Sequence, residues 1–111
     1  MNDHQASSTP TEEDPIIVHI EQDFAPMIPR FMENRKKELV TMRHAMDQGD
    51  FETVRKLAHG MKGAGGSYGF DELTTAAAAL EQAAKAASAH EVSTGLASID
   101  SYLRRVDIVY E

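Results

Sequence analysis

The sequence predicts an all-α protein, an antiparallel up-down four-helix bundle with an N-terminal arm. Apolar residues recur at steps of three and four along four long stretches. Residues that favour helix starts and ends separate these stretches at short intervals. The composition is 41% hydrophobic but only 6% aromatic, so the core must be built from Ala, Leu, Ile, Val and Met, which suit helices better than sheets. A chain of 111 residues is long enough for one such core.

The N-terminal residues are expected to lie outside the bundle. Residues 1–14 are polar and acidic without apolar periodicity, so we expect a disordered tail. Residues 15–25 form the predicted arm, where Ile16, Val18 and Ile20 alternate with other residues. This pattern indicates either a short strand, for which no pairing partner is evident, or a brief helical turn.

The bundle is predicted over residues 26–111. Pro26 and Pro29 fit only the first turn of a helix, because proline lacks the N–H that a helix interior needs. The apolar pattern of this first helix runs to about Gln48 and is followed by Gly49, a residue type common just beyond helix ends.

The other three helices are predicted from their caps. Asp50 and Asp71 are expected N-caps of the second and third helices, and Gly69 ends the second. A capping box over residues 88–91 begins the fourth helix, whose apolar stripe runs to Val106. Connections of two to five residues favour antiparallel neighbours.

Composition excludes several classes of function. A net charge of −7 argues against nucleic acid and anionic membranes, which need clustered Lys and Arg. The absence of cysteine excludes disulfides, thiolate zinc sites and cysteine nucleophiles. No apolar run approaches the ~20 residues that span a bilayer, and the N-terminus does not read as a signal peptide. We therefore expect a soluble cytoplasmic protein, acting as a monomer.

The second helix contains a stretch that opposes its own helix propensity. Four glycines lie within the helical pattern: Gly60, Gly63, Gly65 and Gly66. Each costs about 1 kcal/mol relative to alanine, and roughly 4 kcal/mol in total is a large fraction of a small domain's stability. We therefore expect packing or function to require them.

Helical projection at about 100° per residue assigns these glycines different places. With Val54 facing the core, His59 falls at about 140°, toward solvent. Gly66 and Gly63 fall at about 120° and about 180°, on either side of this imidazole. Gly65 falls among the core residues, where it allows a neighbouring helix to pack closely.

Three cations are predicted beside the exposed surface that His59, Gly63 and Gly66 form. Arg55 and Lys62 fall between His59 and the core, and Lys56 lies on the other flank. Imidazole is a nucleophile near neutral pH because its unperturbed pKa is about 6.5. A phosphoryl group on its Nε2 atom is transferable, and such transfer needs close approach and charge neutralisation, which Lys62 can supply. Arg55 and Gly66 are further candidates for partner binding.

The segment from His59 to Gly69, HGMKGAGGSYG, resembles the motif of the histidine-containing phosphotransfer (HPt) family. That motif reads roughly His-x-Leu/Met-Lys-Gly-small-small-x-x-apolar-Gly. Every constrained position matches, and the loosest is Gly65, where Ala or Ser is more usual. The resemblance is expected to extend over residues 24–109, since the family fold is an antiparallel helical bundle.

The resemblance implies a phosphorelay intermediate. His59 would accept a phosphoryl group from a receiver-domain aspartate or a kinase and pass it to another receiver, while Lys62 contacts the phosphoryl group and Gly63 gives the receiver room. The family also places a polar side chain against the histidine Nδ1 about 22 positions later, which is Glu81 here. The alternative is that Glu81 only pairs with Lys85 at i,i+4.

The resemblance also implies the partners, which are response-regulator receiver domains and a sensor or hybrid histidine kinase. The chain has no room for an ATP-binding domain, so we expect a carrier and not an autonomous kinase. No cofactor or metal site is expected, and any Mg²⁺ would come with the receiver. The initiator methionine and the complete bundle favour a free-standing protein.

Two other functions are weighed against this one. The main alternative is a non-phosphorylated helical-bundle adaptor that docks on a receiver or histidine kinase, although the intact His59 argues against it. A metal- or haem-binding bundle needs inward-facing ligands from several helices, whereas His59 is predicted to face outward. The remaining histidines are expected to be incidental: His4, His19, His44 and His90. Four methionines are expected to fill the core or to edge an apolar docking surface beside His59: Met27, Met32, Met42 and Met46.

Overall fold

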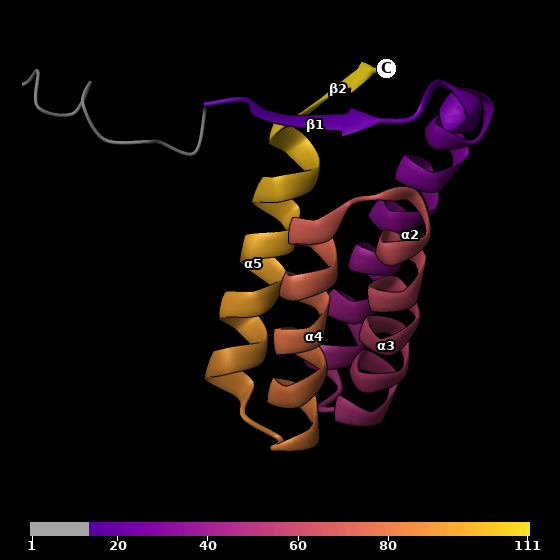
Figure 1. The fold of residues 1–111 in the computed structure, drawn as a ribbon. Coiled ribbons are helices and arrows are strands. Elements are labelled where there is room, and N and C mark those ends of the chain that lie inside the picture. Colours follow the sequence, from indigo (N-terminus) through magenta and orange to yellow (C-terminus); the bar gives the residue numbers. More distant parts are fainter. Residues whose placement is uncertain (1–13) are drawn as a thin grey trace, which may run out of the picture.

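The computed structural model describes residues 14–111. In chain order its elements are strand β1 (Ile16–Ile20), the 3-10 helix η1 (Gln22–Met27), helices α2 (Ile28–Asp47), α3 (Phe51–Tyr68), α4 (Asp71–Lys85) and α5 (Ala89–Arg105), and strand β2 (Val106–Tyr110). Figure 1 shows successive helices running in opposite directions along one axis. The predicted four-helix bundle is confirmed.

The four helices enclose one core. Helix α3 packs against α2 and α4, and α5 packs against the same two helices, with the most extensive contact between α3 and α4. Most of the core side chains come from these helices: Ile28, Phe31, Leu39, Met42, Ala45, Val54, Ala58, Met61, Leu73, Ala77, Leu80, Ala83, Ala84, Val92, Leu96, Ile99, Tyr102 and Leu103. The turn between α3 and α4 adds Phe70. Strand β1 adds Ile20 to the same core.

Two helices begin at the predicted caps. The Asp50 carboxylate accepts a hydrogen bond from the Thr53 backbone N–H over 3.1 Å, and this bond satisfies a donor that has no partner within α3. The Ser88 hydroxyl accepts from the Glu91 N–H over 3.3 Å at the start of α5. These caps define short turns, which hold consecutive helices side by side.

The turn between α3 and α4 differs from the prediction by one residue. Gly69 ends α3 in the left-handed region at φ +93°, as glycine allows. Phe70, and not Asp71, is the N-cap position of α4. Phe70 is fully buried, so its side chain anchors this turn in the core, and Asp71 begins the helix.

The start of the first long helix also differs. Pro29 lies in the first turn of α2, as predicted, but Pro26 belongs to η1. Residues 22–25, which were assigned to the N-terminal arm, are therefore also in the 3-10 helix, so the predicted alternative of a brief helical turn holds for this end of the arm.

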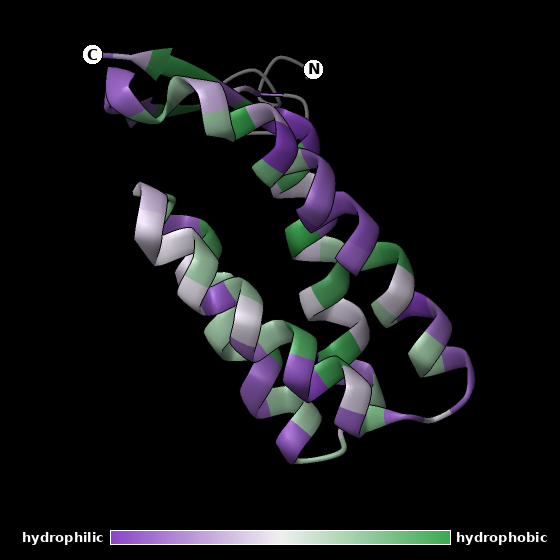
Figure 2. Ribbon diagram, turned by 90° about the vertical axis from the view of Figure 1, so that its right-hand side faces the viewer, coloured by the Kyte–Doolittle hydropathy of each residue, from purple (hydrophilic) through white to green (hydrophobic). Residues whose placement is uncertain are grey.

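The arm has a pairing partner that was not predicted. Strand β1 pairs in parallel with β2, in a register that joins Ile16 to Val106 and Ile20 to Tyr110. Figure 2 shows hydrophobic residues along part of this strand pair, at one end of the bundle. The expectations of an unpaired arm and of a bundle helix through Val106 are wrong, since α5 ends at Arg105. Val106 fits both the helical spacing before it and the alternating pattern after it.

Backbone hydrogen bonds extend this strand pair by one residue. The Gln22 N–H donates to the Glu111 carbonyl over 2.9 Å, and the Glu111 N–H donates to the Ile20 carbonyl over 3.0 Å. Of the predicted disordered tail, residues 1–13 lie outside the described part of the chain. Asp14 is described, and its carbonyl accepts from Arg105 Nε over 2.8 Å.

Candidate functional site

His59 lies on the outer side of α3, as the helical projection predicts. Its side chain is 66% exposed. Neighbouring positions are open as well, because a Cβ added at Gly60 or Gly63 would meet no heavy atom within 4 Å. A second protein can therefore approach this imidazole along a strip of bare helix backbone.

Glu81 reaches the imidazole from the neighbouring helix α4. Its Oε2 lies 3.0 Å from His59 Nδ1, and its Oε1 accepts a hydrogen bond from Lys62 Nζ over 2.8 Å. Its side chain is only 5% exposed, and the Lys85 ammonium is 4.0 Å from Oε2. The predicted contact with His59 is therefore present, and the alternative partner Lys85 lies farther away.

The state of the Glu81 carboxylate follows from these contacts. The hydrogen bond from Lys62 and, after it, the one from His59 lower the pKa of the Glu81 carboxyl below its usual range, against the opposing effect of burial. Glu81 is thus ionised at neutral pH and can only accept hydrogen bonds. The neutral imidazole must then carry its proton on Nδ1, and the lone pair on Nε2 faces outward.

Lys62 stands one helical turn after His59, on the flank that faces α4. Its side chain is about one third exposed, and its ammonium group is fixed by Glu81. Because residues three apart on a helix are neighbours, a group bound to His59 lies near this cation. The arrangement can stabilise a negative charge on Nε2.

Arg55 is paired with a carboxylate of its own helix, so its guanidinium group is less available to a partner protein than the projection indicates. Its Nε and Nη2 donate to the two carboxylate oxygens of Glu52, over 3.0 Å and 2.5 Å. This pairing raises the pKa of Arg55 above its ordinary value, and Lys56 also comes within 4.0 Å of Glu52. The positive edge is thus partly neutralised. The i,i+3 and i,i+4 spacing of Glu52 from these cations was the signal that could have shown it.

The remaining two glycines face α4. A Cβ added at Gly65 would lie 2.8 Å from Thr74 Oγ1, so the predicted close helix approach is present. At Gly66 the same atom would be 3.8 Å away, an ordinary contact. Thr74 was not among the predicted site residues, and the core-facing position of Gly65 was the only signal that some residue of a neighbouring helix had to lie there.

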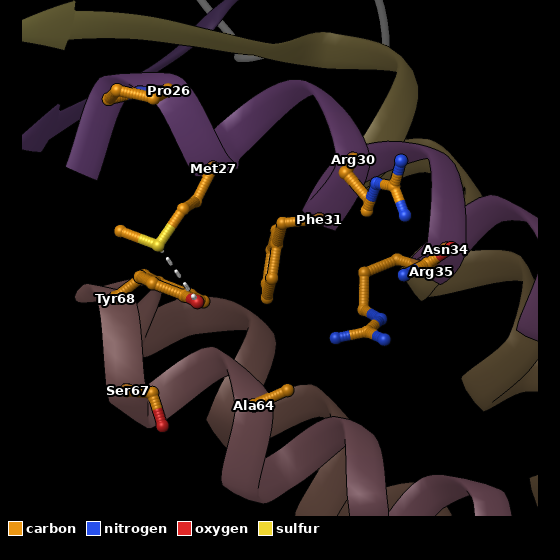
Figure 3. A pocket seen from close by; sticks show the side chains of 9 residues that line it. All are labelled: Pro26, Met27, Arg30, Phe31, Asn34, Arg35, Ala64, Ser67 and Tyr68. Carbon is orange, nitrogen blue, oxygen red and sulfur yellow. Dashed lines mark hydrogen bonds between the residues drawn. The ribbon is translucent and has the colours of Figure 1, made fainter.

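A pocket lies on another side of α3. It has a volume of about 500 Å³ between the η1–α2 segment and α3 (Figure 3). Phe31 and Tyr68 meet edge to face at 5.2 Å in its wall, and the Tyr68 hydroxyl donates to the Met27 sulfur over 3.7 Å. Arg35 stacks on the Phe31 ring with 4.8 Å to the centroid. His59 does not line this cavity, so the candidate chemistry is on an open surface.

The methionines and the other histidines singled out in the sequence lie in different parts of the fold. Met42 is fully buried, whereas Met27 is 43% exposed at the cavity. His19 on β1 lies 3.4 Å from Glu111, and its side chain is exposed. His44 and His90 are exposed on α2 and α5, and His4 lies outside the described residues. Within residues 14–111 no group of three or more His, Cys, Asp or Glu could hold a metal ion. No helix in this range is long and apolar enough to cross a membrane.

Comparison with known proteins assigns the family. A family model described as the Hpt domain matches residues 26–107, most of the chain, and the chain therefore belongs to the Hpt domain family. No curated protein and no solved structure matches it. Membership confirms the resemblance carried by the His59–Gly69 motif. It implies histidine phosphotransfer in two-component signalling, with receiver domains and histidine kinases as the class of partner and a carrier role without kinase activity of its own.

Proposed function

We propose that this protein is a phosphorelay intermediate with His59 as its phosphoacceptor. The Nε2 lone pair attacks the phosphorus of a receiver's aspartyl phosphate or of a phosphorylated kinase. An N–P bond forms, and the bond from phosphorus to the donor oxygen or nitrogen breaks. A second receiver aspartate then attacks the same phosphorus and releases the imidazole. We also propose that the protein acts as a monomer in the cytoplasm.

The observation that carries this proposal is the contact of Glu81 Oε2 with His59 Nδ1 at 3.0 Å. It holds the proton on Nδ1 throughout the transfer, so no proton has to leave when Nε2 forms its bond. A carboxylate partner of this kind orients an imidazole and makes its other nitrogen more basic. Lys62 stabilises the charge of the transferring group, and Gly63 leaves room for the receiver.

Three further residues have smaller assignments. Gly66 adds no side chain to the exposed surface beside His59. Arg55 adds positive charge near His59, which Glu52 partly neutralises. The chain supplies no cofactor to the reaction in this proposal, and Mg²⁺ belongs to the receiver partner.

The test is transfer of label from phosphorylated receiver domains in the presence of Mg²⁺. Wild-type protein is expected to acquire acid-labile, base-stable label, which is characteristic of phosphohistidine, and His59→Gln should acquire none. His90→Gln serves as the matched control, because it changes an exposed histidine on α5 and should be labelled like the wild type. If a broad panel of receivers transfers no label while one binds wild type and His59→Gln equally well, the protein is instead a non-phosphorylated adaptor.

A further inference from the structure

Gly65 differs from the other glycines of α3 in what surrounds it. A Cβ at this position would lie 2.8 Å from Thr74 Oγ1, 3.3 Å from the Phe70 carbonyl oxygen and 3.4 Å from the Thr74 nitrogen. At the other three positions an added Cβ meets open space or an ordinary contact. Helices α3 and α4 therefore approach each other so closely at Gly65 that a side chain there would meet the Thr74 hydroxyl.

Thr74 occupies the space that Gly65 leaves open. Its hydroxyl donates to the Lys62 carbonyl oxygen over 3.2 Å. Lys62 is also the residue whose ammonium group holds Glu81 Oε1. Helix α4 thus contacts Lys62 twice, at its backbone through Thr74 and at its side chain through Glu81.

Thr74 and Glu81 lie on the same face of α4. They are seven residues apart, which is about two turns, about 10 Å along the axis and a rotation of about 20°. A short helical segment of this kind moves as a unit, so a displacement at Thr74 is transmitted to Glu81. The Glu81 hydrogen bonds of 2.8 and 3.0 Å tolerate little displacement, because such bonds weaken beyond about 3.2 Å.

We propose that Gly65 and Thr74 are positioning residues, a matched pair that sets the α3–α4 separation at which Glu81 reaches His59. The close packing of Gly65 against Thr74 affects the imidazole tautomer of His59 by positioning Glu81. It does not itself contact a partner protein. Its consequence for phosphotransfer rests on the proposed function, whereas its consequence for the tautomer does not.

The experiment measures the His59 tautomer from the ¹⁵N chemical shifts of its ring nitrogens, at a pH where the imidazole is neutral. Gly65→Ala should lower the ratio of the Nδ1–H to the Nε2–H form by about tenfold, the factor for one charge-assisted hydrogen bond. Glu81→Ala gives the reference for complete loss of the contact. Gly60→Ala is the matched control for this readout, since its Cβ meets open space, and it should keep the wild-type ratio.

A second variant separates the tautomer effect from loss of folding. Gly65→Ala/Thr74→Ala removes the hydroxyl that the new methyl group would meet, so it should recover most of the wild-type ratio. Recovery is expected to be incomplete, because the Phe70 carbonyl stays close. If Gly65→Ala does not fold, the double variant should fold and show the recovered ratio. A wild-type ratio in folded Gly65→Ala, or a double variant no better than the single one, would overturn the proposal.

Label transfer from a phosphorylated receiver is measured on the same samples. If wild type accepts no label while the tautomer ratios change as expected, the phosphorelay function fails and the positioning pair stands. If wild type accepts label while Gly65→Ala keeps the wild-type ratio, the positioning pair fails and the phosphorelay function stands.

Discussion

At the scale of single residues, the site depends on a carboxylate that is shared by two partners. Glu81 is almost completely buried, and each of its oxygens contacts one residue of α3. The position of His59 could be predicted from helical periodicity, because an exposed face follows from spacing alone. The contact with Glu81 needed the family resemblance, since spacing within one helix does not say which residue of another helix lies opposite. Thr74 could not be predicted for the same reason.

Lys62 is expected to contribute through its charge. Lys62→Ala should slow phosphotransfer by on the order of 10²-fold, the usual effect of removing one preorganised donor from a transferring group. The measurement is the initial rate of labelling by a phosphorylated receiver. Lys36→Ala, an exposed lysine on α2, is the control for net charge. Equal rates for the two variants would show that Lys62 acts only by its contribution to the overall field.

The ionised state of Glu81 predicts a pH dependence of stability. Because its folded-state pKa is lowered, the stability that it contributes is present above the ordinary glutamate pKa of about 4.3 and is lost as the pH falls through the folded-state value. Wild type should melt at a higher temperature than Glu81→Gln at neutral pH, and the difference should shrink as the pH falls through the lowered folded-state pKa of Glu81. Thermal unfolding followed by circular dichroism measures this. Glu33→Gln, on the exposed side of α2, should show a smaller difference at every pH.

At the scale of secondary structure, local signals explain what the sequence could predict. The caps at Asp50 and Ser88 act within a few residues of their own position, so these helix starts were readable. The strand pair was not, because β1 and β2 lie at opposite ends of the described chain and parallel pairing leaves no turn sequence to recognise. Val106 fits both the helical spacing of apolar residues and the alternating pattern of a strand. The end of α5 was therefore predicted beyond Arg105, where the helix ends.

The contact of α2 with the end of α3 and the turn after it depends on a small aromatic cluster. Phe31 is 5% exposed, and its ring stacks on Phe70 with 4.7 Å between centroids. Phe31→Ala should lower the free energy of unfolding by about 3–5 kcal/mol, the range for removing a buried phenylalanine, as measured by urea denaturation. Phe24→Ala is the comparison, because Phe24 is only half-buried and should cost less. A loss below about 1 kcal/mol for Phe31→Ala would mean that the cavity beside it collapses and refills the space.

At the scale of the whole molecule, His59 and the strand pair lie on different parts of the fold. Figure 1 shows β1 and β2 across one end of the bundle, beyond the helices. Within residues 14–111, the side chains that contact and orient His59 come from α3 and α4. The structure therefore separates the strand pair from the elements that arrange the site.

Removal of residues 106–111 tests this separation. The variant should melt about 5–10 °C lower, because β1 loses its hydrogen-bonding partner and the packing around Ile20 is weakened. Amide exchange at residues 16–20 should become fast, while the ¹⁵N shifts of the His59 ring stay at their wild-type values. Val109→Ala, which alters an exposed side chain of β2, should leave both observables unchanged. A changed His59 ring spectrum in the truncated protein would contradict the separation.

The parallel pairing of β1 with β2 also has a consequence for the order of folding. Contacts between consecutive antiparallel helices close short loops, whereas the strand pair closes a loop that contains the whole bundle. The entropic cost of closing a loop rises with its length. We therefore expect helix docking to precede strand pairing, with a transition state for folding that contains helices but no sheet. A contact absent from the transition state slows unfolding without changing the rate of folding. Pairing of β1 with β2 is thus expected to lower the unfolding rate and to lengthen the lifetime of the native bundle, without changing the rate at which the bundle forms.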